Sequence, residues 1–394
     1  GYSPDGGILA FVTASDAFTL QNLTLKLVRL PEGTVETITR LTSPETEPPT
    51  EFDICDPKHE AARAITIYDG LSWSPDGRQL AFMGVIDGPT SDLYLYTRAD
   101  GSIKQLTYGP SQAYGVNWSN SGKYIVHFGA SCFGTGAGFN MTGAWAARSD
   151  NDEVVDLYTP DAESSGEEFV DNVWGKTDAF FVTTLSGCPY RDLRRVEIET
   201  QAVTPLYSGC FNNYVSQPAH LIAVVASENF SANSGLYLYE GGRGEPRYIP
   251  EPYGRSVELY NDLALVEVVD SNQSLSEIRS FNLQDGKPGW YSGRGGFPRF
   301  GLDGEHFAWL ENDTFYLGWW GTDQHQVLST QGVRYPFWYE EVSEAMFDVR
   351  QHLLYFGGYD NPSLYLASEP DFAPVAISGG LNPQGDPILV FADR

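Results

Sequence analysis

Short hydrophobic segments with alternating polar positions follow one another along nearly the whole chain, and they recur as a unit. Each unit has a hydrophobic strand ending near Ser-Pro-Asp-Gly, a second strand of the Leu-Ala-Phe type, and a third strand of the Leu-Tyr-Leu-Tyr type. A period of two residues is typical of half-buried β-strands. The pattern therefore predicts repeated antiparallel sheets.

The second and third strands of this unit occur eight times. The second strands are predicted at Ile8–Val12, Leu80–Met83, Tyr124–Phe128, Ala179–Thr183, Leu221–Val225, Leu263–Val268, His306–Leu310 and Leu353–Phe356. The third strands are predicted at Leu23–Leu27, Leu93–Tyr96, Ala144–Ala147, Leu193–Val196, Leu236–Tyr239, Ile278–Phe281, Phe315–Leu317 and Leu364–Leu366. A fourth short strand closes each unit, and four-stranded units recurring about every 42 residues are typical of β-propeller blades.

One unit carries the turn and strand motif in full. It reads Trp73-Ser74-Pro75-Asp76-Gly77 and then Leu80-Ala81-Phe82, and it resembles the tandem propeller repeats of the TolB-like family. The resemblance implies a β-propeller architecture. The repeat count predicts an all-β fold with one β-propeller over residues 1–394 and eight four-stranded blades, with seven blades as the alternative. Family members include periplasmic scaffolds that bind other envelope proteins, and similar propellers precede peptidase domains or act as lyases.

The end of the chain supplies a further hydrophobic segment. Ile388–Phe391 is predicted to form the missing inner strand of the first blade and to close the ring, since closure removes two free sheet edges. The alternative is that the chain ends at a disordered boundary.

The net charge of the chain limits the classes of partner that it can bind. Fifty-two Asp and Glu residues against twenty-four Lys and Arg residues give a net charge of −28, which repels nucleic acid and anionic membrane surfaces. No segment approaches the roughly 20 apolar residues that cross a bilayer, so no membrane insertion is expected.

Two insertions, residues 43–70 and 129–143, are expected on one face of the propeller, where loops commonly bind partners. All four cysteines fall on that face, and none forms a Cys-x-x-Cys metal motif. We predict the disulfides Cys188–Cys210 and Cys55–Cys132, with four free thiols as the alternative. Disulfides indicate an extracytoplasmic location: periplasmic, cell-surface or secreted. No metal or cofactor is expected.

Three successive links between blades each carry an arginine, and these are predicted to form an anion site at the mouth of the central channel. Aromatic side chains nearby offer a stacking surface. The candidate binding residues are Arg255, Arg294, Arg334, Tyr214, Phe337 and Trp338. In the alternative, the arginines pair with carboxylates such as Glu251 and Glu340.

Catalytic motifs are sparse. There is no Gly-x-Ser-x-Gly motif, and His127 is the one histidine considered as a general base. His220, His306 and His352 begin equivalent strands and are expected to be solvated.

These patterns favour a non-enzymatic extracytoplasmic propeller that serves as a protein-binding, ligand-binding or assembly scaffold. Its partner would be another envelope or surface protein, or a second copy of the chain. The alternative is a carbohydrate-active propeller, a lyase or hydrolase that acts on an anionic saccharide at the channel mouth.

Overall fold

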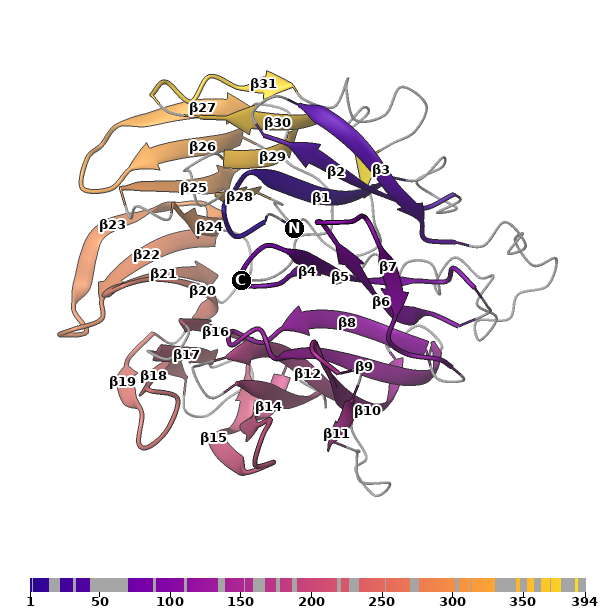
Figure 1. Ribbon diagram of the computed structural model, residues 1–394. Helices are drawn as coiled ribbons and strands as arrows, with labels where there is room; N and C mark the ends of the chain where they lie inside the picture. Colours follow the sequence, from indigo (N-terminus) through magenta and orange to yellow (C-terminus); the bar gives the residue numbers. More distant parts are fainter. Residues whose placement is uncertain are drawn as a thin grey trace. The chain divides into compact units, whose positions relative to one another are not determined.

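The described part of the chain consists of β-strands, turns and short connections (Figure 1). The computed structural model describes residues 1, 3–13, 22–30, 33–42, 70–87, 90–109, 112–133, 139–151, 153–158, 167–174, 178–185, 190–217, 221–226, 234–251, 253–269, 276–301, 305–312, 314–329, 345–347, 353–357, 363–368, 370–376 and 387–388. The chain divides into two compact units. The first unit is Gly1–Val182, Val196–Val203 and Gly379–Arg394, and the second unit is Thr183–Arg195 and Thr204–Ser378.

Three four-stranded antiparallel sheets lie wholly in the first unit. One has the order β3-β2-β1-β32, with β1 (Ile8–Thr13), β2 (Thr24–Arg29), β3 (Thr34–Arg40) and β32 (Pro387–Ile388). The next contains β4 (Leu71–Trp73), β5 (Gln79–Gly84), β6 (Asp92–Thr97) and β7 (Ile103–Gln105). The third contains β8 (Gln112–Trp118), β9 (Tyr124–Phe133), β10 (Phe139–Arg148) and β11 (Val154–Tyr158).

Four more sheets lie in the second unit. The first contains β16 (Asn213–Gln217), β17 (Leu221–Ala226), β18 (Gly235–Glu240) and β19 (Arg247–Ile249), and the second contains β20 (Gly254–Tyr260), β21 (Leu263–Val269), β22 (Ser276–Asn282) and β23 (Pro288–Arg294). The third contains β24 (Gly296–Phe300), β25 (His306–Glu311), β26 (Thr314–Trp319) and β27 (His325–Ser329). The fourth contains β28 (Ala345–Phe347), β29 (Leu353–Gly357), β30 (Ser363–Ala367) and β31 (Val375–Ala376). The sheet of β12 (Glu167–Trp174), β13 (Ala179–Leu185), β14 (Tyr190–Glu197) and β15 (Val203–Phe211) has residues in both units. The predicted all-β fold of four-stranded antiparallel sheets is confirmed.

Local hydrogen bonds explain the recurring turn. The Ser74 hydroxyl donates to the Asp76 carboxylate at 2.7 Å and accepts from the Gln79 amide at 2.9 Å. The same carboxylate accepts from the Arg78 amide at 3.0 Å, and these bonds, that from Ser74 first, lower the pKa of Asp76. Gly77 has a φ of +67°, which suits a residue without Cβ. The motif is therefore a hairpin whose polar groups satisfy one another.

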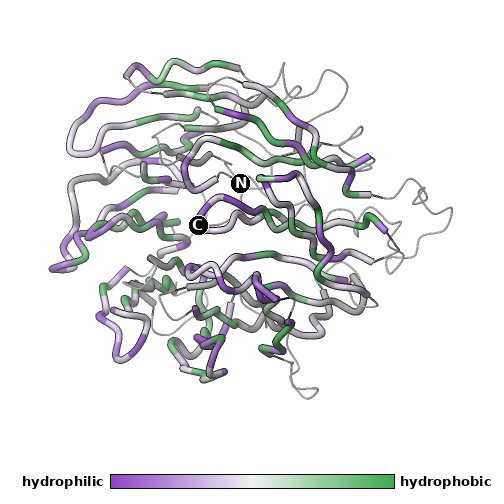
Figure 2. Tube along the Cα trace, in the orientation of Figure 1, coloured by the Kyte–Doolittle hydropathy of each residue, from purple (hydrophilic) through white to green (hydrophobic). Residues whose placement is uncertain are grey.

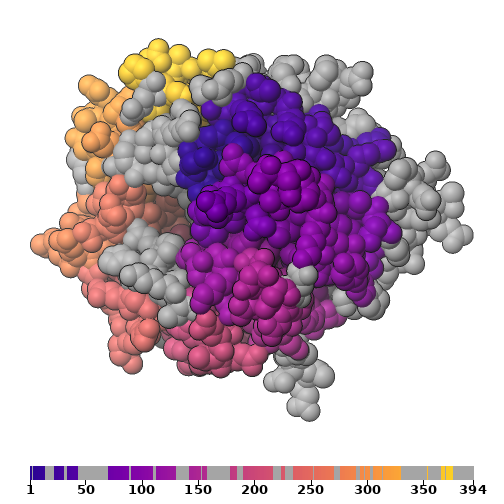
Figure 3. Space-filling view, viewed as in Figure 1, coloured from indigo at the N-terminus to yellow at the C-terminus, as the bar shows by residue number. Residues whose placement is uncertain are grey.

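Neighbouring sheets of the first unit share buried apolar layers. The layer between β4–β7 and β8–β11 consists of Ala81, Met83, Leu93, Leu95, Ala113, Val116, Trp118, Ile125 and Ala147. Figure 2 shows the same alternation as green and purple along the strands, and Figure 3 shows the atoms of the first two sheets, in indigo to purple, side by side. Burial of one face against the next sheet is how propeller blades are stabilised.

The second unit is built in the same way, from sheets that share buried apolar layers. One layer, between β16–β19 and β20–β23, contains aliphatic residues such as Val225, Leu238 and Val266. The next layer joins Leu265 and Ile278 to the aromatic residues of β24 and β25. This second layer positions the pocket described below.

Both predicted insertions have described flanks in the first unit. Thr42 forms a parallel bridge with Val85, and the Gly70 carbonyl accepts from the Met83 amide at 3.0 Å, so both flanks of residues 43–69 meet the end of β5. The other insertion is partly strand, because β9 and β10 continue to the paired residues Phe133 and Phe139. Cross-strand pairing thus extends into a segment that was expected to be a loop.

The C-terminal strand β32 pairs antiparallel with β1, with Val12 opposite Ile388 and Thr13 opposite Pro387. The pairing covers one residue of the predicted closing segment, Ile388, and the preceding Pro387, and residues 389–391 lie outside the described part. Within the described residues, no helix has the length and apolar character needed to cross a membrane.

Candidate ligand-binding pocket

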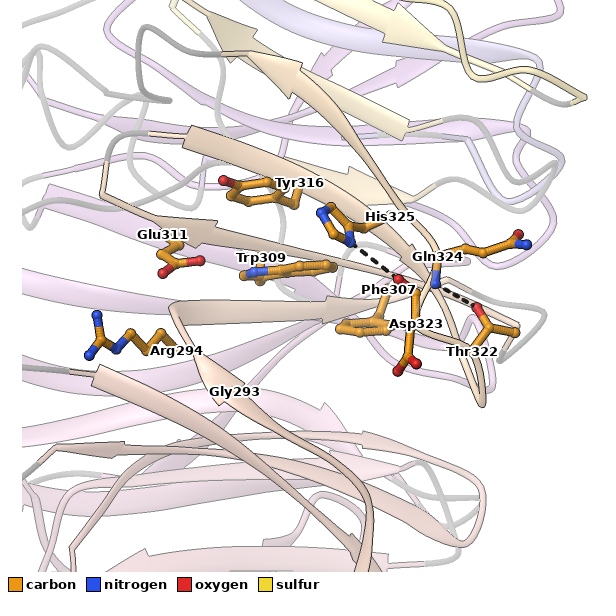
Figure 4. Close-up of a pocket in the computed structure, with 10 residues that line it drawn as sticks. All are labelled: Gly293, Arg294, Phe307, Trp309, Glu311, Tyr316, Thr322, Asp323, Gln324 and His325. Carbon is orange, nitrogen blue, oxygen red and sulfur yellow. Dashed lines mark hydrogen bonds between the residues drawn. The ribbon is translucent and has the colours of Figure 1, made fainter.

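A cavity of about 450 Å³ lies in the second unit, between the end of β23 and one face of the sheet β24–β27 (Figure 4). Its lining residues are Gly293, Arg294, Phe307, Trp309, Glu311, Tyr316, Thr322, Asp323, Gln324 and His325. The volume falls in the range of about 300–1,000 Å³ that is usual for small-molecule sites. The cavity is therefore large enough for an organic ligand.

The wall of the pocket follows from the alternation of β25. Side chains two residues apart on a strand share a face, so Phe307, Trp309 and Glu311 all face the cavity. Tyr316 joins them because it lies opposite Trp309 in the register of β25 and β26. A short stretch of two strands thus supplies most of the wall.

The rings of this wall hold one another in place. Trp309 is nearly parallel to Phe307, with centroids 4.8 Å apart, and to Tyr316, with centroids 5.2 Å apart. His325 meets the Tyr316 ring edge-on at 5.6 Å. Phe307 and Trp309 are buried, whereas Tyr316 is half-buried and His325 is exposed. The outer two rings therefore provide the accessible aromatic surface.

Charged and polar groups lie at opposite ends of the pocket. Figure 4 shows Arg294 and Glu311 at one end, and Asp323 with its neighbours in the β26–β27 turn at the other. Phe307, beside that turn, precedes Glu311 by four residues of extended strand, or about 13 Å. Arg294 is exposed, and no ion pair of its guanidinium is found within the described residues. The two carboxylates of the pocket are thus far apart.

The turn at the far end is held by its own hydrogen bonds. The Thr322 hydroxyl donates to the Trp319 carbonyl at 3.0 Å and accepts from the Gln324 amide at 3.1 Å. The His325 Nδ1 atom lies 3.4 Å from the Asp323 carbonyl (Figure 4). These contacts fix the turn and place its polar side chains at the rim of the pocket. The Asp323 carboxylate takes part in none of them.

Two of the three predicted arginines, Arg255 and Arg294, lie at opposite edges of one sheet. Gly254, Val268, Glu277 and Arg294 form one row across β20–β23, and Arg255 follows Gly254. Arg255 and Arg294 are therefore separated by three strand spacings, about 14 Å. Arg294 lines the pocket, and Arg255 does not. Arg334, Phe337 and Trp338 lie outside the described residues, so the three-arginine site stays a prediction.

Tyr214 lies in a separate aromatic cluster. Its ring packs edge-on against Tyr190 at 6.3 Å and against Phe211 at 6.0 Å. Glu251, the carboxylate considered as a partner of the predicted arginines, is nearly fully buried and accepts from the Arg279 guanidinium at 3.1 Å. Glu340, the other one, lies outside the described residues.

One of the four cysteines is described in full. Cys210, in β15, is disulfide-bonded, and its sulfur accepts a hydrogen bond from Arg191 at 3.4 Å. Cys188 and Cys55 lie outside the described residues. Cys132 lies in β9, but its side chain is not among the described ones. The two pairings therefore stay predictions.

Two histidines differ from expectation. His127 is 4% exposed and stacks on Trp145, and burial lowers its pKa to about 4, so it is a neutral core residue out of reach of a substrate. His306, expected to be solvated, is buried between Trp319 and Phe372, because a distant segment covers its strand. His220 and His352 lie outside the described residues. Across the described residues, no group of His, Cys, Asp and Glu has the arrangement of a metal site.

Sequence reasoning found Arg294 but missed Trp309, Glu311, Tyr316 and His325. The alternation of β25 was a sufficient signal for the first two, since it predicts that they share a face. No sequence signal showed that this face borders a cavity.

No protein-family model matches the chain, and no curated protein matches it. Solved structures do. Acylaminoacyl peptidase from Pyrococcus horikoshii is 14% identical, with 95% of this chain and 52% of that chain covered and a TM-score of 0.52. The β-propeller domain of the Trilobed protease from Pyrococcus furiosus is 12% identical, with 96% of each chain covered and a TM-score of 0.50.

At these identities the likeness shows the fold alone, and the fold is that of a β-propeller. The chain spans about half the length of the acylaminoacyl peptidase chains that it matches. TolB from Acinetobacter baumannii is 14% identical, with 74% of this chain and 66% of that chain covered and a TM-score of 0.39. That score is too low to add an argument, so the TolB-like resemblance rests on the repeat motif.

Proposed function

We propose that the chain is a binding module without catalytic activity of its own, and that the pocket beside β25 holds its ligand. The observation that carries the proposal is the joint presence, on the strands of one unit, of an aromatic wall, a cavity and the exposed side chain of Arg294. A few polar groups around an aromatic wall are typical of ligand sites.

The alternative, a lyase or hydrolase that acts on an anionic saccharide, is less well supported at this pocket. Glycoside hydrolysis by a carboxyl pair needs the two groups about 5–9.5 Å apart. Glu311 and Asp323 lie at opposite ends of the cavity, and the stretch of β25 from Phe307, beside the Asp323 turn, to Glu311 is about 13 Å long. Binding without cleavage fits this spacing better.

The proposed architecture is an eight-bladed ring closed by the C-terminal strand. Pairing of β32 with β1 supports it, as do the eight four-stranded sheets found in the described residues. The Pyrococcus furiosus propeller carries the description "open velcro topology", so closure is a point on which the two chains would differ.

We place the protein outside the cytoplasm, as a partner of another envelope or surface protein or of a second copy of itself. The disulfide at Cys210 supports an oxidising compartment. The pairs Cys188–Cys210 and Cys55–Cys132 are the proposed bonds. Peptide mapping without reduction would identify them, and four alkylated thiols would contradict this location.

Crystals soaked in a mixture of neutral, cationic and anionic organic fragments test the binding function. Bound fragments are expected between Arg294 and the Tyr316 ring, and fewer at other surfaces of the second unit. The variant Tyr316→Ala, which widens the pocket and removes one of its two accessible rings, should lose them. Fragment density everywhere except this pocket would contradict the proposal.

A further inference from the structure

We infer that the ligand of this pocket is a short neutral oligosaccharide. The inference rests on the proposed binding function and names the chemical class of the ligand. It begins with the shape of the wall: Tyr316 and His325 present ring surface that is not fully buried, above the buried rings of Phe307 and Trp309. A pyranose ring has an apolar face of C–H groups, which packs on the electron-rich face of an aromatic ring.

The polar groups around the rings suit hydroxyls. Sugar hydroxyls both donate and accept, and they are best satisfied by a mixture of donors and acceptors. Arg294 supplies donors at one end of the pocket, where Glu311 supplies acceptors. The turn at the other end adds the Asp323 carboxylate and the Gln324 amide, both exposed. A ligand that spans the pocket finds donors and acceptors at both ends.

The charges disfavour an anionic ligand. The pocket contains two carboxylates and one guanidinium, and the whole chain has a net charge of −28. An anionic saccharide would meet Arg294 only beside Glu311, and its approach would be opposed by the field of the protein. The ligand class therefore differs from the anion predicted from the arginine pattern alone.

A cationic ligand is also less suited. A cation gains most over an open face of Trp. Trp309 is 7% exposed, and its ring lies nearly parallel to both Phe307 and Tyr316 at about stacking distance. The guanidinium of Arg294 would further oppose a second positive charge at that end of the pocket.

Isothermal titration calorimetry with defined trisaccharides tests the inference. The neutral probes are maltotriose, cellotriose and triacetylchitotriose, the anionic probe is trigalacturonate, and the cationic probe is the peptide trilysine. At least one neutral trisaccharide is expected to bind with a Kd below about 1 mM, and more tightly than either charged probe. Mass spectrometry of the mixture should recover the trisaccharide uncleaved.

Three variants make the result specific. Arg294→Ala and Glu311→Ala should each weaken binding of the neutral probe by about tenfold, because each removes the hydrogen bonds of its side chain to the ligand. Both residues are accessible, so folding should be retained, and a circular dichroism melt checks this. Arg243→Ala, at an exposed arginine of the same unit outside the pocket, is the matched control and should leave the affinity unchanged.

The outcomes separate the two proposals. Tighter binding of trigalacturonate or trilysine would overturn the oligosaccharide inference and leave the binding function standing. Fragment density in the pocket together with no heat of binding from any trisaccharide would also overturn the oligosaccharide inference alone. Absence of both fragments and probes from the pocket would overturn both proposals.

Discussion

The sheets β4–β7 of the first unit and β24–β27 of the second unit have the same four-stranded plan, and the pocket described above borders the second sheet. In both, an aromatic residue of the second strand lies opposite a tyrosine of the third: Phe82 opposite Tyr94, and Trp309 opposite Tyr316. The two ring pairs stack alike, at 5.5 Å and 20° and at 5.2 Å and 14°.

The difference lies around these rings. In the first sheet, Gly84 follows Phe82 by two residues, and a Cβ there would lie 3.1 Å from Ile86, so the space is filled. The Tyr94 hydroxyl donates to Asp87 at 2.7 Å and closes the same side. In the second sheet, Glu311 takes the place of Gly84.

The same strand plan is closed beside Phe82 and borders a cavity beside Trp309. Both sheets have the same backbone pairing and the same kind of ring pair. The first sheet has Gly84 and the hydrogen bond from Tyr94 to Asp87, whereas the second sheet has the Glu311 carboxylate and the cavity. Tyr94 is 4% exposed, whereas Tyr316 is half-buried. The two faces therefore differ at a few positions next to the same kind of aromatic pair.

Truncating the two aromatic residues should have unequal effects. Phe82→Ala leaves a cavity at a fully buried site and is expected to lower the free energy of unfolding by about 3–5 kcal/mol. Trp309→Ala should cost less stability, because its site already borders a cavity. Urea denaturation of both variants measures this, and an equal or reversed order would contradict the comparison.

Acid should act on the first unit through His127. Its pKa is about 4 in the folded chain against 6.5 when unfolded, so between these values the unfolded chain binds more protons. The contribution is present in full above pH 6.5 and is lost as the pH falls to 4, an effect of about 3 kcal/mol.

Urea denaturation from pH 7.5 to 4 measures this loss. The variant His127→Gln should flatten that part of the profile, and His325→Gln, at an exposed histidine of the second unit, should not. A profile of His127→Gln that still falls as steeply would show that other groups cause the acid sensitivity.

The turns offer a smaller contrast. Ser74→Ala leaves the Gln79 amide without its acceptor and should cost about 1–2 kcal/mol. The corresponding hairpin β20–β21 of the second unit is instead a two-residue turn, in which Asn261 has a φ of +46°. Asp262→Ala, at an exposed position of that turn, should change stability by about 0.5 kcal/mol or less, and thermal melts of both variants compare the two.

The smallest effect concerns single hydroxyl groups. Tyr94→Phe removes the bond to Asp87 and should cost about 1 kcal/mol. Tyr316→Phe should cost close to nothing, since no hydrogen bond of the Tyr316 hydroxyl is found within the described residues. Equal costs in chemical denaturation would mean that the side of the second sheet is closed in solution as well.

Much of the fold could be predicted because its causes are local. Alternation with a period of two needs only neighbouring residues, and the Ser74–Gln79 turn is held by bonds within six positions of the chain. His306 shows the limit of such reasoning. His306 begins a strand as predicted. It is buried because Phe372, which lies sixty-six residues later in the sequence, packs against its ring.

The amino-acid sequence by itself determined the strands, the turns and their grouping into four-stranded sheets, since these depend on side-chain alternation and short-range hydrogen bonds. Only the tertiary structure decided that Arg294 lines a pocket while Arg255 lies at the other edge of the same sheet. The same holds for the closed and open faces beside Phe82 and Trp309. These outcomes depend on which side chains of separate strands and sheets fill the space between them, and that packing has no signal in any one repeat.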